Sequence, residues 1–264
     1  MLERLLLIGS KSGELTILGQ KFEILDPKLG ESRIEKGAIF INCAFLRREF
    51  INKLGEQEFS RQNLEIMALP TRAIRNIGLF NFVNLSSGAA VLVDQNPNNS
   101  LVDAYSVLKR RSEIEFEQES KSVGSNFINC RLYSISGSHL NEFENLALST
   151  FISRALKDQQ IHVNSPQSKR TYIDGVNLMA VVIRLAIQGE SKNFDSGGTL
   201  ISILGLAEAI IKVAGKTKVE VSVGTNPEAS YFGDYESFNR IAVGIDQNLL
   251  SIENQITNTM KAFD

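Results

Sequence analysis

Hydrophobic and polar positions follow two different periods along the first half of the chain. Residues 37–44 form a short apolar run bounded by glycine, and residues 79–85 form another, as is typical of strands buried on both faces of a parallel sheet. Residues 56–77 and 102–120 instead repeat apolar positions at helical spacing. Because Pro70 cannot donate to the previous turn, we expect a kink or a division there. Further strands are expected at 16–18, 22–25 and 126–133. The alternation of strands and helices predicts βαβ units.

The start and the second half of the chain show a different spacing of apolar residues. Apolar positions in residues 2–7 favour a short amphipathic helix that ends near Gly9. Beyond Gly137 helical spacing predominates. Helices are expected at 146–156, 174–186, 201–214 and 247–262, and short strands at 160–163 and 218–223, with turns at 164–168 and 197–199. We therefore expect an α/β protein with one domain at 1–137 and a smaller lobe at 138–264, partly interleaved with the first.

Composition excludes several classes of protein. The chain has 264 residues, of which 43% are apolar and 22% charged, as in an ordinary globular protein. A net charge of -2 gives no electrostatic reason to expect a nucleic acid partner. No apolar run is long enough for a membrane span, and the charged start does not resemble a signal peptide, so we expect a cytoplasmic location. Cys43 and Cys130 lie far apart and only two histidines occur, so no metal site is expected.

One pair of residues suggests acid–base chemistry. Tyr105 and Lys109 are four residues apart and therefore lie on one side of the predicted helix. A nearby ammonium favours the phenolate form of a tyrosine, and a hydroxyl of Ser86 or Ser87 could orient a substrate oxygen. An ordinary pair on an amphipathic helix has the same spacing. The apolar strand that ends in two serines just before this helix is what favours a proton-transfer site.

Several short motifs follow one another in an order that resembles a known family. Residues 39–44 resemble a strand that ends in alanine beside a cofactor, and residues 82–89 resemble a strand that delivers an active-site serine or threonine. Tyr105 and Lys109 match a tyrosine and lysine pair, and residues 130–137 resemble an arginine-containing strand and turn. Weaker matches are Asn63, Glu113 and residues 167–178. From about Gly37 onward, the chain resembles the extended short-chain dehydrogenases, in particular the nucleotide-sugar epimerases and dehydratases.

The resemblance implies a Rossmann-like parallel sheet, an NAD or NADP cofactor and a nucleotide-sugar substrate. Tyr105 would exchange a proton with a sugar hydroxyl while hydride passes between the sugar carbon and the nicotinamide ring. Lys109 would lower the pKa of the tyrosine and hold the nicotinamide ribose, and Ser87 or Ser86 would orient the hydroxyl. Ala44 and Asn63 would join Lys109 at the cofactor, and Arg170, Arg131 and Ser87 would bind the substrate.

The role implied for Arg170 is to pair with the substrate diphosphate. The sequence fits a solvated surface pair with Lys169 equally well. The resemblance also implies a homodimer that pairs through the helices at 56–77 and 102–120.

The start of the chain departs from the family pattern. A dinucleotide site of this class needs a first strand and a glycine-rich turn at a helix N-terminus. Gly9, Gly13 and Gly19 lack that spacing, and residues 2–7 resemble the helix that would follow the missing turn. We therefore expect an N-terminally shortened Rossmann-like sheet. Two functions agree with the sequence: an NAD(P)-dependent epimerase, dehydratase or reductase in polysaccharide biosynthesis, or a non-catalytic binding or partner subunit of the same fold.

Overall fold

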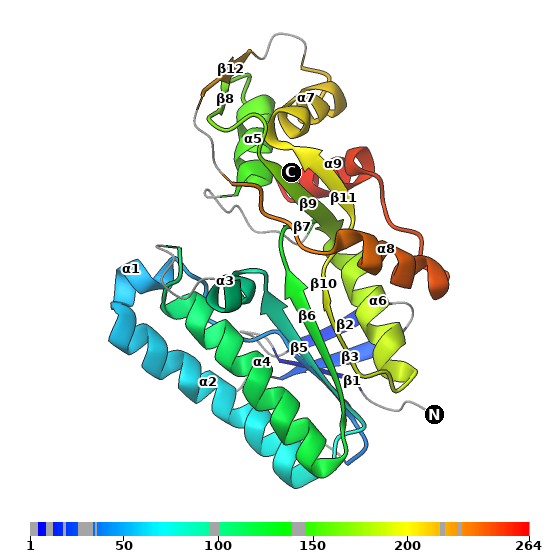
Figure 1. Ribbon diagram of the computed structural model, residues 1–264. Coiled ribbons are helices and arrows are strands. Elements are labelled where there is room, and N and C mark those ends of the chain that lie inside the picture. Colours follow the sequence, from blue (N-terminus) through cyan, green and yellow to red (C-terminus); the bar gives the residue numbers. More distant parts are fainter. Residues whose placement is uncertain are drawn as a thin grey trace. The chain divides into compact units, whose positions relative to one another are not determined.

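The computed structural model shows two compact units (Figure 1). Unit 1 contains residues 1–132 and 182–194, and unit 2 contains residues 133–181 and 195–264. Each unit has its own sheet. The structure describes residues 5–8, 13–17, 20–25, 34, 36–95, 101–138, 146–216, 220–225 and 229–263.

Unit 1 is built on a seven-stranded sheet with the order β10-β6-β5-β4-β1-β3-β2. The neighbouring strands β3, β1, β4, β5 and β6 pair in parallel, and β2 pairs with β3 in the antiparallel direction. This arrangement is Rossmann-like, as the sequence predicted. The strands are β1 (Leu5–Ile8), β2 (Gly13–Ile17), β3 (Gln20–Leu25), β4 (Ile39–Asn42), β5 (Asn81–Ser87), β6 (Asn126–Leu132) and β10 (Lys192–Asp195).

Two long helices of unit 1 pack side by side on the sheet (Figure 1). The helices of this unit are α1 (Phe50–Leu54), α2 (Glu56–Ile77), α3 (Ala89–Gln95) and α4 (Ala104–Val123). Phe82 of β5 lies at the centre of the core, with its ring 5.3 Å from Phe40, 5.1 Å from Phe116 and 6.2 Å from Phe127. Burial of these rings fixes α4 against β4, β5 and β6. Of the kink or division expected at Pro70, the division is wrong, because one helix runs through this residue.

The start of the chain corrects the sequence prediction. Leu5–Ile8 is a strand rather than part of a helix, and it pairs with β3 on one side and with β4 on the other. A run of four apolar residues has no distinct helical or strand period, so pairing with two neighbours decided its structure. The first strand of the Rossmann-like sheet is therefore present.

Unit 2 combines small sheets with helices. Strands β11 (Thr199–Ser202), β9 (Lys169–Asp174) and β7 (Ile135–Ser136) form one sheet, and β12 (Val221–Val223) pairs with β8 (Ile161–Val163). The helices are α5 (Ala147–Leu156), α7 (Ile203–Val213), α8 (Tyr235–Gly244) and α9 (Ile252–Met260). Helix α6 (Gly175–Ile187) contributes residues to both units. The sequence had not predicted β7, β9 or α8, and it placed the start of α7 two residues early.

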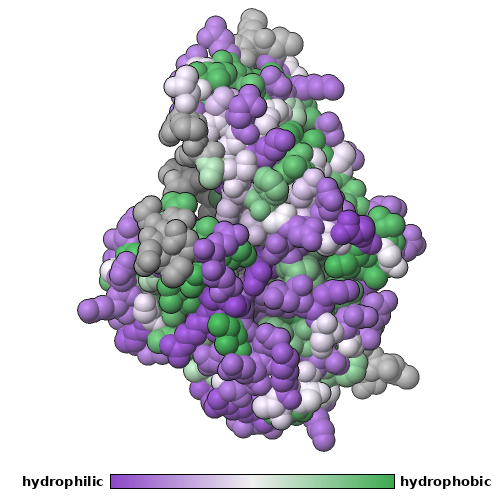
Figure 2. Space-filling view, viewed as in Figure 1, coloured by the Kyte–Doolittle hydropathy of each residue, from purple (hydrophilic) through white to green (hydrophobic). Residues whose placement is uncertain are grey.

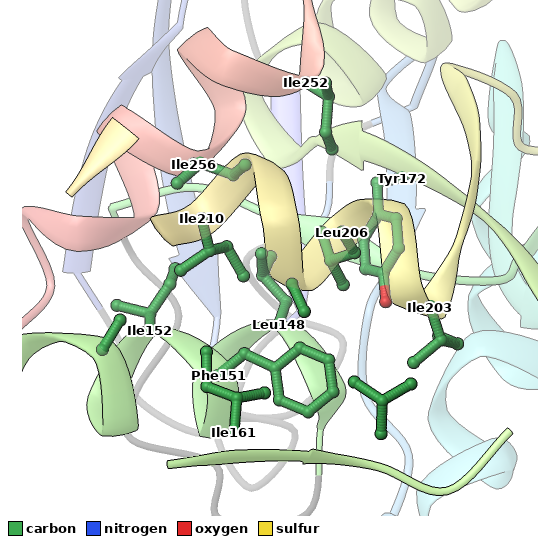
Figure 3. Close-up of a cluster of buried hydrophobic side chains, with 13 residues drawn as sticks. Leu148, Phe151, Ile152, Ile161, Tyr172, Ile203, Leu206, Ile210, Ile252 and Ile256 are labelled. Carbon is green, nitrogen blue, oxygen red and sulfur yellow. The ribbon is translucent and has the colours of Figure 1, made fainter. Parts of the chain in front are cut away.

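The core of unit 2 lies between α5, α7 and α9 (Figure 3). Leu148 and Ile152 of α5 point toward Leu206 and Ile210 of α7, and Ile256 of α9 closes the cluster. Their spacing of three or four residues along each helix is the apolar stripe that predicted these helices. Within the described residues, no helix has the length and apolar character needed to cross a membrane.

Candidate active site

The predicted serines lie at the carboxyl end of β5. Ser86 and Ser87 are both buried, and they point to opposite faces because side chains alternate along a strand. The Ser87 hydroxyl accepts a hydrogen bond of 3.2 Å from the backbone amide of Ala89, at the start of α3. The backbone amide of Gly88 donates to the carbonyl of Leu132 on β6 at 2.8 Å. These bonds fix the turn that leads from β5 into α3.

Tyr105 lies in the first turn of α4, and that turn is held by a side-chain cap. The Asp103 carboxylate accepts hydrogen bonds of 2.9 Å from both the backbone amide and the hydroxyl of Ser106. Arg48 pairs with the same carboxylate at 2.9 Å, and its guanidinium lies 5.3 Å from the centre of the Tyr105 ring. The edge of the Tyr105 ring meets the ring of Phe45 at 5.7 Å. The half-buried phenol therefore has a defined position.

Lys109 lies one turn further along α4 and is buried, with 6% of its surface exposed. Its ammonium donates a hydrogen bond of 3.0 Å to the carbonyl of Leu85 and lies 4.1 Å from the centre of the Phe45 ring. The distance from the ammonium to the centre of the Tyr105 ring is 6.0 Å. Burial lowers the pKa of Lys109 to about 8, against the opposing effects of Cys43 and Glu113. The amine is therefore mostly charged at neutral pH, beside the tyrosine.

A row of asparagines crosses the sheet below the carboxyl end of β5, and Asn42, Asn84 and Asn129 in it are buried. The amide of Asn42 on β4 donates to Asn84 on β5 at 3.3 Å, Asn84 donates to Asn129 on β6 at 2.9 Å, and Asn129 donates to Asn193 on β10 at 2.9 Å. The Asn42 carbonyl oxygen also accepts from the backbone amide of Ala44 at 3.3 Å. We call these four residues the asparagine ladder. It links four neighbouring strands through their side chains and orients the Ala44 backbone.

Asn63 of α2 is fully buried. Its side-chain oxygen accepts a hydrogen bond of 2.9 Å from the backbone amide of Leu46, and its amide donates to the carbonyl of Phe59 at 3.0 Å. Both polar groups of the Asn63 side chain are thus hydrogen-bonded to protein backbone. The segment after β4, which carries Ala44 and Phe45, is anchored to α2 through this side chain.

Arg131, which the sequence assigned to the substrate, is half-buried and forms an ion pair with the buried Glu113. Its guanidinium donates two hydrogen bonds of 2.9 Å to the carboxylate of Glu113 on α4. Arg110 also contacts this carboxylate at 3.2 Å and pairs with Asp94 of α3 at 2.9 Å. Burial raises the pKa of Glu113, but the hydrogen bonds of Arg131, Ser86 and Asn129 and the charge of Arg131 together outweigh it, and the pKa stays below its usual value. The network joins α3, α4 and β6 around the serines.

Arg170 lies in unit 2, half-buried on β9. Its guanidinium lies 5.9 Å from the centre of the Tyr231 ring, which in turn packs against Tyr133 at 4.8 Å. The geometry of unit 2 therefore places this arginine among aromatic rings. Its predicted role at a diphosphate stays a prediction.

Sequence reasoning missed three residues of the site. Phe45, Arg48 and Asp103 enclose the tyrosine and lysine pair, as the contacts above show. Asp103 carried a detectable signal, because an aspartate three residues before a serine at a predicted helix start is a common N-cap pattern. Phe45 and Arg48 had none, since their contacts depend on a sheet that brings distant segments together.

The residues at this edge fit the nicotinamide ribose of the cofactor that the resemblance implies. An ammonium has three donors, and the Leu85 carbonyl takes one while the Phe45 ring faces the group. A donor is left for a ligand hydroxyl. The pyrophosphate end differs, because the next described element after β1 is strand β2 and not a helix that could present free amides. The described part of the site thus fits one half of a dinucleotide and includes no helix N-terminus after β1 to anchor the other half.

Comparisons with solved structures identify the fold. A UDP-glucose 4-epimerase from Thermotoga maritima, solved with UDP-glucose, aligns with a TM-score of 0.74 and 14% identity over 98% of both chains. RMD from Pseudomonas aeruginosa, complexed with NADPH, aligns with a TM-score of 0.73 and 15% identity over 98% of both chains. A UDP-glucose 4-epimerase from Thermus thermophilus, in complex with NAD, aligns with a TM-score of 0.71 and 14% identity over the same shares. At such identities the likeness shows the fold alone.

Comparison with curated proteins finds no match. A family model does match, over residues 26–195, and it is described as the NAD dependent epimerase/dehydratase family. The match covers more than half of the chain and includes the strands and helices that carry the tyrosine, the lysine and the serines. The chain therefore belongs to the NAD dependent epimerase/dehydratase family.

Proposed function

We propose that this chain is a nicotinamide-dependent enzyme that epimerises, dehydrates or reduces a nucleotide sugar, with Tyr105 as its proton-transfer residue. The observation that carries the proposal is the buried ammonium of Lys109 beside the phenol. A charged amine inside a protein costs stability, so a position that keeps one near a half-buried tyrosine is typical of a functional site. The family and the nucleotide-sugar enzymes among the structural neighbours support the same conclusion.

Tyr105 would remove a proton from a sugar hydroxyl when the sugar carbon is oxidised and return it on reduction. Lys109 would favour the phenolate through its charge, because an opposite charge nearby stabilises the ionised form of an acid. Bound nicotinamide would supply the hydride acceptor and donor. The cap formed by Asp103 and Arg48 would keep the phenol in place during turnover, because it fixes the first turn of α4.

Ser87 and Ser86 are both candidates for the residue that orients the substrate hydroxyl. Ser87 already accepts a hydrogen bond from Ala89, which leaves its own hydroxyl hydrogen for another acceptor. Ser86 points to the face that carries Phe82 and Asn84, on which α4 packs. We propose that Ser87 or Ser86 orients the sugar hydroxyl, and that Arg170 pairs with the substrate diphosphate.

The test is Tyr105→Phe, which removes only the phenolic hydroxyl and keeps the ring contacts with Phe45 and Arg48. Turnover of UDP-glucose or a related nucleotide sugar should fall by a factor of about 100 or more, while the unfolding midpoint stays unchanged. Tyr235→Phe in unit 2 is the matched control, and its turnover should equal that of the wild type. Equal turnover of the Tyr105 variant and the wild type would exclude the proposed role.

The second candidate is a non-catalytic binding or partner subunit. The observation that favours it is the strand after β1, in the place where a dinucleotide-binding helix would begin. Such a subunit would bind nucleotide sugar without turnover and without a response to any nicotinamide nucleotide. Thermal unfolding with NAD+, NADH, NADP+ or NADPH separates the two, since a ligand at 100 times its Kd stabilises the folded state by about 2.7 kcal/mol.

We also propose that the protein acts as a homodimer that pairs through α2 and α4. Figure 2 shows a mainly hydrophilic surface over these helices, with small hydrophobic patches among the polar side chains. Leu64 of α2 and Val107 and Ile114 of α4 are exposed apolar residues on them. Light scattering on wild type and Ile114→Glu tests this, because a charge at the interface should convert a dimer to a monomer.

A further inference from the structure

The carboxyl end of β1 lies level with the candidate active site. In the sheet, Ile8 of β1 is opposite Asn42 of β4, and Asn42 is opposite Asn84 of β5. The chain that leaves β1 therefore starts at the edge where Ala44 and Lys109 lie. In parallel nucleotide-binding sheets, the pyrophosphate of a dinucleotide sits at this edge on a helix N-terminus.

The next described element after β1 is strand β2 and not such a helix. Only four residues separate Ile8 from Gly13, where β2 begins. Gly13 pairs with Ile24 near the carboxyl end of β3, and Ile17 pairs with Gln20 at its start. Strand β2 thus runs antiparallel to β3, back to the end of the sheet where β3 begins. A crossover that includes a helix needs at least about 10 to 12 residues, so four cannot provide one.

A strand is a poor substitute for the helix as an anion site. The first turn of a helix presents free backbone amides and the positive end of its dipole, whereas strands have only small net dipoles. Alternate amides of β2 are in addition committed to pairing with β3. Among the residues that the structure describes, the pyrophosphate and the adenosine beyond it therefore lack the helix N-terminus that the fold usually provides. The nicotinamide half is different, since Tyr105 and Lys109 are both in place for it.

We propose that this chain binds its cofactor through the nicotinamide ribonucleotide half alone, and that the ADP half of a dinucleotide adds little to affinity. Tyr105 and Lys109 would contact the mononucleotide. The asparagine ladder, which orients the Ala44 backbone, would support this site from within the sheet. This inference rests on the proposed function for the nicotinamide half. The ligand class is a reduced or oxidised nicotinamide mononucleotide, whether free or as part of NAD or NADP.

Isothermal titration calorimetry of the full chain with NADH, reduced nicotinamide mononucleotide and ADP-ribose tests the proposal. We expect the Kd of the mononucleotide to lie within tenfold of that of NADH, and ADP-ribose to show no saturable binding at concentrations that saturate the protein with NADH. A mononucleotide bound more than tenfold more weakly than NADH overturns the proposal. Saturable binding of ADP-ribose overturns it as well.

Two variants on α4 locate the site. Lys109→Met should lose binding of the mononucleotide by at least tenfold, because it removes the buried ammonium beside Tyr105. Lys121→Met removes an exposed ammonium from the end of the same helix and should leave the Kd unchanged. Tight binding of both NADH and ADP-ribose would overturn this inference and leave the proposed function standing. Absence of binding by NADH and by the mononucleotide would overturn both.

Discussion

Replacing Lys109 by methionine should make the protein more stable and inactive. Methionine has a similar length and no charge, so it fills the same space beside Phe45 without a buried ammonium. The pKa of Lys109 falls from 10.5 to about 8 because burial disfavours the charged form. At about 1.4 kcal/mol for each pH unit, the charged form is destabilised in the folded state by about 3 kcal/mol.

Part of this gain is offset. The variant loses the hydrogen bond to the Leu85 carbonyl, and an unpaired buried carbonyl costs about 1–2 kcal/mol. We therefore expect the free energy of unfolding at pH 7 to rise by about 1–2 kcal/mol. For a protein of this size, each kcal/mol corresponds to about 2–4 °C in the unfolding midpoint.

The stability difference should depend on pH in a defined window. Below pH 8 Lys109 is protonated in both folded and unfolded chains, and the full cost of the buried charge is present. Between pH 8 and 10.5 the unfolded chain holds a proton that the folded chain has released, so wild-type stability rises with pH through this residue. The advantage of Lys109→Met over the wild type should therefore shrink across this window.

Urea unfolding followed by circular dichroism, at pH 7 and about pH 9.5, measures both effects. Circular dichroism suits a chain that contains no tryptophan. Lys121→Met is the control, because its ammonium is exposed and paired only with Glu117, and its stability should change by less than about 0.5 kcal/mol. A Lys109→Met variant less stable than the wild type at pH 7, or a difference that does not vary with pH, would refute the reasoning.

Three further substitutions test the buried polar network, all by urea unfolding. Glu113→Gln leaves the guanidinium on β6 without its buried partner and should cost about 3 kcal/mol. Asn84→Ala breaks the asparagine ladder at its centre, unpairs two buried amides and should cost about 2–4 kcal/mol. Gln255→Leu in unit 2 removes three hydrogen bonds of a buried amide, to Ser136, Tyr172 and Leu250, and should cost a similar amount.

Exposed neighbours provide the controls for these substitutions. Glu117→Gln loses an ion pair on the surface of α4, and Asn254→Ala removes a side chain from the surface of α9, so each should change stability by less than about 0.5 kcal/mol. If Glu113→Gln or Asn84→Ala were as mild as its control, the network would not contribute to stability as argued. Likewise, if Gln255→Leu were as mild as Asn254→Ala, the hydrogen bonds of Gln255 would not contribute to stability as argued.

The sequence predicted best those elements whose pattern of apolar residues is clear within the element itself. Helix α2 begins and ends where the apolar spacing indicated, and β4, β5 and β6 lie within or next to the predicted apolar runs. Short elements were harder. The strand β1 was predicted as a helix, and β9 was not predicted at all, because a run of four to six residues is stabilised by its pairing partners rather than by its own pattern.

The candidate site divides in the same way. The sequence by itself determined that Tyr105 and Lys109 share one side of a helix, because a separation of four residues is a local property of the backbone. Only the tertiary structure decided what surrounds them. The Leu85 carbonyl that holds the ammonium lies 24 residues away, and Arg48 reaches Ser106 across 58 residues. Such contacts form only after the sheet has aligned its strands, and no local pattern encodes them.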